Sequence, residues 1–135
     1  MPTMNNKRAI DIGFFLLFSL MGVAVVSAAP HITGSRLDYP AFLPWMRAGV
    51  EGFSKVSALG LFIVGFLAGA VRRDRPWLWG MATMALYPVW AVVEMTLDPK
   101  SHNLWPLEFI CYAVESLVAV VGAFIGARLS RILIK

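Results

Sequence analysis

Three glutamates in or beside apolar stretches are the residues of this sequence best suited to chemistry: Glu94, Glu108 and Glu115. An ionisable side chain inside a bilayer is costly, so it is a candidate for binding an ion, relaying a proton or pairing with an opposite charge. Glu108 and Glu115 are seven residues apart and share one face of a helix, while Glu94 precedes them across a short loop. The spacing predicts that the three carboxylates converge, which could form a cation or proton site open to the outer side.

A structural alternative is an ion-pair cluster that fixes the register of the helices. Lys55 is expected at a depth similar to that of Glu94, so it could pair with Glu94 or Glu115. Arg47 could then pair with Glu108. These two cations are the predicted charge partners of the glutamates.

A second structural alternative concerns Glu115 alone. At a rise of 1.5 Å per residue, Glu115 lies about 12 Å deeper than Leu107, near the centre of a bilayer, where its charge is most costly. Glu115 would then be protonated and hydrogen-bonded to Tyr87 or Ser57.

Metal and cofactor chemistry has little support. Asp98 and His102 are weak candidates for metal ligands, because their spacing matches no standard ligand motif and the segment favours a turn. A single cysteine excludes an internal disulfide, and no glycine-rich phosphate loop is present. We expect no metal and no cofactor.

The elements that must position these residues are apolar helices. Apolar residues make up 59% of the chain and charged residues 15%, against about 25% charged in soluble domains. A spanning helix needs about 20 mostly apolar residues. Four segments qualify, at 12–29, 56–71 (starting as early as 44), 77–97 and 107–129. The predicted fold class is all-α: an integral membrane antiparallel four-helix bundle, one domain over 1–135.

Two proline-containing segments modify this scheme. Pro44 suits the first turn of a helix, and Arg47, Glu51 and Lys55 recur every four residues after it. That recurrence indicates an outward extension of the second helix, or alternatively a lid over a cavity. Pro88 predicts a bend within the third helix.

Positive charges predict the orientation, because cytoplasmic loops are enriched in lysine and arginine. Eight of the twelve lysines and arginines are expected on one side: Lys7, Arg8, Arg72, Arg73, Arg75, Arg128, Arg131 and Lys135. Both termini and loop 72–76 are therefore predicted to be cytoplasmic, and loops 30–55 and 98–106 outside, in a plasma (inner) membrane. Alternatively, residues 26–28 resemble a signal-peptide cleavage site, which would leave three helices.

Four glycines predict close helix packing. Gly65 and Gly69, like Gly122 and Gly126, are separated by four residues, a spacing that lets helix backbones approach closely. The contact could lie within one chain or between two copies.

Three functions fit these expectations. The first is a non-enzymatic structural or accessory subunit of a membrane complex. The second is a small oligomeric cation- or proton-coupled transporter or channel using the three glutamates. The third is an intramembrane enzyme acting on a lipid or quinone. The expected partners are the lipid bilayer and another membrane protein or a second copy, and the chain lacks the basic face that would indicate nucleic-acid binding.

Overall fold

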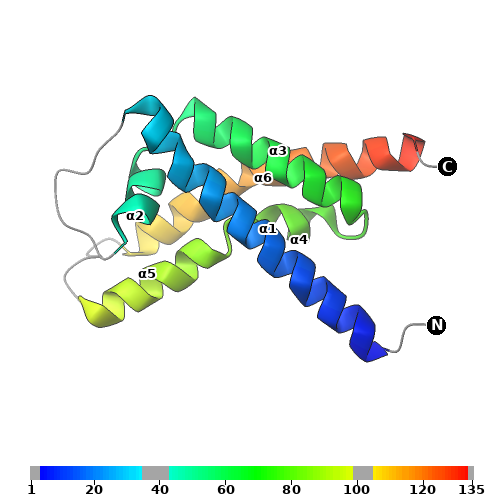
Figure 1. The fold of residues 1–135 in the computed structure, drawn as a ribbon, viewed down its shortest axis with the longest axis horizontal. Helices are drawn as coiled ribbons and strands as arrows, with labels where there is room; N and C mark the ends of the chain where they lie inside the picture. Colours follow the sequence, from blue (N-terminus) through cyan, green and yellow to red (C-terminus); the bar gives the residue numbers. More distant parts are fainter. Residues whose placement is uncertain (1–3, 35–42, 99–104, 134–135) are drawn as a thin grey trace.

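The computed structural model describes residues 4–34, 43–98 and 105–133, and all regular structure in these ranges is helical (Figure 1). The elements are α1 (Met4–Thr33), α2 (Pro44–Glu51), α3 (Lys55–Val71), α4 (Pro76–Ala82), α5 (Leu86–Leu97) and α6 (Trp105–Leu133). The predicted all-α class is confirmed. His102 and Lys135, named above, lie outside the described residues.

Three helical segments are long and apolar enough to cross a membrane: Asn6–Thr33, Pro76–Leu97 and Pro106–Leu133. A fourth is obtained if α2 and α3 together form one bent span. Large apolar side chains are exposed along α1 and α6, including Ile12, Leu16, Leu20, Val114, Leu117 and Val121. Such surfaces suit contact with lipid.

The predicted continuous extension of the second helix back to Pro44 is wrong. α2 and α3 meet at an angle of 100°. Gly52 ends α2: its N–H donates to the Ala48 carbonyl oxygen (2.9 Å), and the Phe53 N–H donates to that of Val50 (3.2 Å). A new helix then starts with a reciprocal cap, in which the Ser57 N–H donates to Ser54 Oγ (3.3 Å) and the Ser54 N–H donates to Ser57 Oγ (3.2 Å).

The predicted third helix is divided into α4 and α5 at residues 83–85. The N–H groups of Thr83, Met84 and Ala85 bond to carbonyls three residues earlier, at 3.1–3.3 Å, so the chain tightens there. Pro88 explains the position of this break. A proline lacks the N–H that would bond to the carbonyl four residues before it, here that of Met84, and its ring crowds that carbonyl. The bend therefore lies one turn before Pro88 itself.

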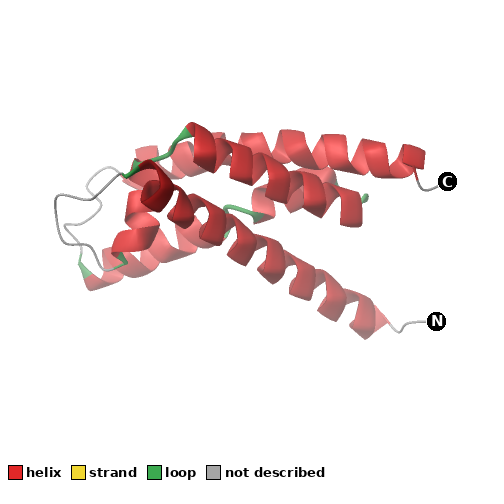
Figure 2. Cartoon of the chain, turned by 45° about the horizontal axis from the view of Figure 1, so that its top comes forward, coloured by secondary structure: helices red, strands yellow, loops and turns green. Residues whose placement is uncertain are grey.

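The four packing glycines lie at one contact between α3 and α6. A Cβ atom added to Gly65 or Gly69 would collide with the carbonyl oxygen of Ala119 or Ala123, respectively. Gly122 and Gly126 approach the carbonyl oxygens of Phe62 and Phe66 in the same way. Because the paired numbers rise together, α3 and α6 run in the same direction. This intramolecular contact is the most extensive between any two helices of the described residues. The two helices lie side by side in both views (Figure 1 and Figure 2).

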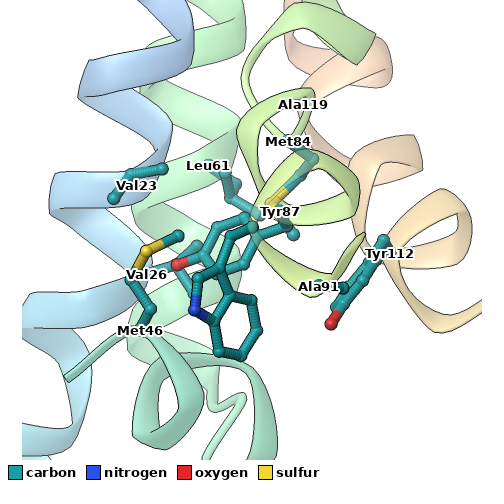
Figure 3. Packing of buried hydrophobic residues seen from close by; sticks show 10 residues of the cluster. Val23, Val26, Met46, Leu61, Met84, Tyr87, Ala91, Tyr112 and Ala119 are labelled. Carbon is teal, nitrogen blue, oxygen red and sulfur yellow. The ribbon is translucent and has the colours of Figure 1, made fainter. Parts of the chain in front are cut away.

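The buried core centres on Tyr87 of α5. Around it pack Val26 of α1, Met46 of α2, Leu61 of α3 and Tyr112 of α6 (Figure 3). Tyr87 thus lies where residues of α1, α2, α3 and α6 come together, and α2 packs mainly against α1. A smaller cluster of Phe18, Val64, Ala68 and Trp79 fills the region toward the end of α3.

Candidate functional site

Arg47 on α2 is the centre of the polar cluster at one end of the molecule. Its Nε donates to Glu51 Oε1 (2.9 Å), four residues along the same helix, and its Nη1 donates to Glu94 Oε2 (3.4 Å) on α5. Glu94 is only 2% exposed. A buried carboxylate with an arginine partner is compensated, so this ion pair ties the short α2 helix to α5.

The predicted pairing of Lys55 with Glu94 or Glu115 is wrong. Lys55 is exposed at the first residue of α3, and within the described ranges it makes no ion pair. The 100° bend accounts for the difference, because it takes Lys55 off the helical face that carries Arg47 and Glu51. Arg47 of α2 makes the ion pair with Glu94 that was predicted for Lys55.

Glu108 lies in the first turn of α6, next to the same cluster. It lines a small cavity together with Arg47, Glu51, Trp90 and Tyr112. The cavity has a volume of about 60 Å³. This is room for about two water molecules. Arg47 and Glu108 thus line the same cavity, and their direct pairing stays a prediction.

Glu115 lies two helical turns further along α6 and is partly buried. Its Oε2 atom is buried and accepts no hydrogen bond from the residues that the structure describes. The predicted donors bond elsewhere: the Tyr87 hydroxyl lies 3.4 Å from Ser27 Oγ on α1, and Ser57 caps α3. The predicted hydrogen bond from Tyr87 or Ser57 to Glu115 is therefore wrong.

Tyr112 takes part in the same polar cluster from α6. Its side chain is buried and lines the small cavity beside Arg47 and Glu108. Arg47 of α2 therefore lies beside both Glu94 and Glu108, and the convergence of Glu115 with them stays a prediction. The sequence offered a signal for this role, because Tyr112 is four residues after Glu108 and three before Glu115, on the same helical face.

The weak metal candidates are not assembled into a site. Asp98 is exposed and ends α5, and His102 falls outside the described residues. In the ranges 4–34, 43–98 and 105–133, no group of three His, Cys, Asp or Glu side chains is close enough to hold a metal ion. Asp98 is therefore the residue that ends α5.

A second arginine cluster, at the other end of α3, did not emerge from the sequence pattern. Arg72 forms an ion pair with Asp11 of α1 and lies 4.0 Å from Asp74. Its guanidinium also lies over the rings of Phe14 (5.3 Å) and Trp79 (5.0 Å). Trp79 Nε1 donates to the Asp74 carbonyl oxygen (2.8 Å). The cluster joins α1, α3 and α4.

Comparison with known proteins finds no family model, curated protein or solved structure that matches the chain. Its class therefore rests on the helices themselves: an all-helical chain with three to four helices able to cross a membrane. The ion pairs described above form two arginine-centred clusters at opposite ends of α3.

Proposed function

We propose that the chain is a four-span inner-membrane protein, an antiparallel bundle with both termini and loop 72–76 in the cytoplasm. Loops 30–55 and 98–106 then lie outside. The distribution of lysine and arginine supports this orientation. So does the arrangement in Figure 1, where the two ends of the chain lie toward the same end of the long axis.

Within the membrane the chain acts as a non-enzymatic structural or accessory subunit of a larger complex. The ion pair between Arg47 and buried Glu94 carries this proposal. A site that binds and releases a substrate needs polar groups that exchange partners. Here the most buried carboxylate of the described residues is bonded to an arginine of the same chain, and that bond joins α2 to α5.

The proposal is tested by asking whether the isolated chain transports ions and whether it has a partner in cells. Purified protein in vesicles should carry no proton or cation flux above that of empty vesicles. Cross-linking in intact cells should give one discrete product with a second protein, at a fixed stoichiometry. Flux in the vesicles that Glu115→Gln abolishes, with normal expression of the variant, would contradict an accessory role.

One observation favours a second candidate, a small oligomeric transporter or channel for cations or protons. Oε2 of Glu115 is buried without a hydrogen-bond donor from the described residues, and a small cavity lies beside Glu108, seven residues earlier on the same helical face. A carboxyl group held in this way can exchange a proton or bind a cation.

Difference infrared spectroscopy separates the two candidates. Wild type minus Glu115→Gln, in lipid nanodiscs, isolates the carboxyl band of Glu115. The matched control is Glu51→Gln, which alters a carboxylate that is 42% exposed. A Glu115 band that is insensitive to Na⁺ and K⁺ supports the accessory role, and a band that shifts with either cation supports transport.

A further inference from the structure

A groove at the end of α6 combines basic and apolar walls. It lies between the last third of α6 and the start of α4 and has a volume of about 750 Å³. The residues that matter for its chemistry are Pro76, Phe124, Ile125, Arg128, Arg131 and Ile132. We call this the basic groove. Among the residues that the structure describes, no aspartate or glutamate lines it, and Arg128 and Arg131 are its charged side chains.

Along α6, the aromatic residue of the groove precedes its two arginines. Phe124, Arg128 and Arg131 follow one another at four- and three-residue spacing and therefore share a helical face. Arg131 lies about 10 Å nearer the helix end than Phe124. Because this end of α6 carries the excess of positive charge, the arginines fall at headgroup depth and Phe124 falls among the acyl chains.

Both arginines present their guanidinium groups to the surroundings. Arg128 and Arg131 are exposed, as are Phe124 (52%) and Ile125 (41%). Arg131 Nη2 donates to the Arg73 carbonyl oxygen (2.6 Å), which holds the side chain at the groove. A guanidinium has five N–H donors, so the others remain to bind phosphate oxygens in a forked geometry.

We propose that the basic groove binds an anionic phospholipid. Arg128 and Arg131 bind its phosphate, and Phe124 and Ile125 contact one acyl chain. The combination of two cations with an adjoining apolar wall complements such a lipid in charge and polarity, as basic pockets beside spanning helices generally do. The inference rests on the proposed membrane orientation and is independent of the accessory role.

Native mass spectrometry of the full chain in detergent tests this inference. Dioleoyl phosphatidylglycerol and dioleoyl phosphatidylcholine, which share acyl chains, are added in separate titrations. The intact protein should bind phosphatidylglycerol more tightly. Because each basic residue contributes about 1 kcal/mol, Arg128→Gln should weaken it about fivefold and the double variant with Arg131→Gln about 25-fold. Binding of phosphatidylcholine should not change.

The matched control removes the same charge elsewhere. Lys7→Gln combined with Arg8→Gln changes two exposed cations of α1 that do not line the groove. Because exposed charges away from a site are screened by salt, it should alter phosphatidylglycerol binding by less than about twofold. Arg128→Gln alone leaves the bond between Arg131 and Arg73 intact, so it reports on binding even if the double variant folds poorly.

Three results would overturn the inference: no preference for phosphatidylglycerol in the intact protein, an equal loss in the control, or full displacement by excess inorganic phosphate. Alkaline extraction of the expressed protein separates this failure from failure of the proposed function. A chain that remains with the membrane but shows no lipid preference refutes only the lipid site. A chain that is extracted refutes the membrane assignment itself.

Discussion

Arg47 and Arg72 hold their positions at opposite ends of α3 by different means. Arg47 bonds to Glu94, whose side chain is only 3% exposed. Arg72 bonds to Asp11, whose side chain is 38% exposed, and lies over two aromatic rings. The carboxylate at the Arg47 end is shielded from water and is compensated by an arginine, whereas the carboxylate at the Arg72 end can also be hydrated. Substitution of Arg47 is therefore expected to lower the free energy of unfolding more than substitution of Arg72.

The largest effect is expected when Arg47 is removed. Arg47→Met should lower the free energy of unfolding by about 3–5 kcal/mol, because it removes the arginine whose charge compensates the buried Glu94 carboxylate. The measurement is reversible unfolding of purified protein in mixed micelles, followed by circular dichroism. In a Glu94→Gln background the same substitution should cost much less. Equal losses in both backgrounds would refute the coupling.

The glycine contact near the Arg72 end should show the next largest effect. Gly69→Ala places a methyl group against the Ala123 carbonyl oxygen, so α3 and α6 must separate, at a cost of about 1–3 kcal/mol. Gly13→Ala is the matched control, because nothing lies within 4 Å of an added Cβ there. Both variants are compared by the same unfolding measurement. Equal stability of the two would show that the contact is looser than described.

Removing Arg72 should cost less than removing Arg47. Arg72→Met loses the pair with Asp11 and the contacts with Phe14 and Trp79, which together contribute about 1–2 kcal/mol. Arg72→Lys keeps the charge but loses the planar stacking, so it should recover only part of this stability. If Arg72→Met proves as damaging as Arg47→Met, exposure of the carboxylate is not what separates the two clusters.

The smallest effect is expected at Lys55, and it sharpens the contrast with Arg47. Lys55→Ala should change the free energy of unfolding by less than about 0.5 kcal/mol, as exposed substitutions usually do. Melting curves of Lys55→Ala and wild type should coincide. A loss of several kcal/mol would mean that Lys55, rather than Arg47, compensates a buried glutamate.

Parts of the site were predictable from the sequence because they depend on spacing along one helix. Glu108, Tyr112 and Glu115 share a face of α6 by position alone, and the pairing of Arg47 with Glu51 follows from their separation by four residues. The partner of Glu94 was not predictable in this way. It depends on α2 turning away from α3 by 100°, which a serine cap and one glycine bring about.

The sequence by itself determined that the chain is helical and where its apolar helices run, because apolar length and breaker residues act locally. It also indicated which glycines allow close approach. Only the tertiary structure decided that α3 and α6 are the pair that use them, that Arg47 bonds to Glu94, and that Arg72 joins α1 to α4. These contacts link residues distant in the chain, and they depend on the angles between helices, which no local pattern encodes.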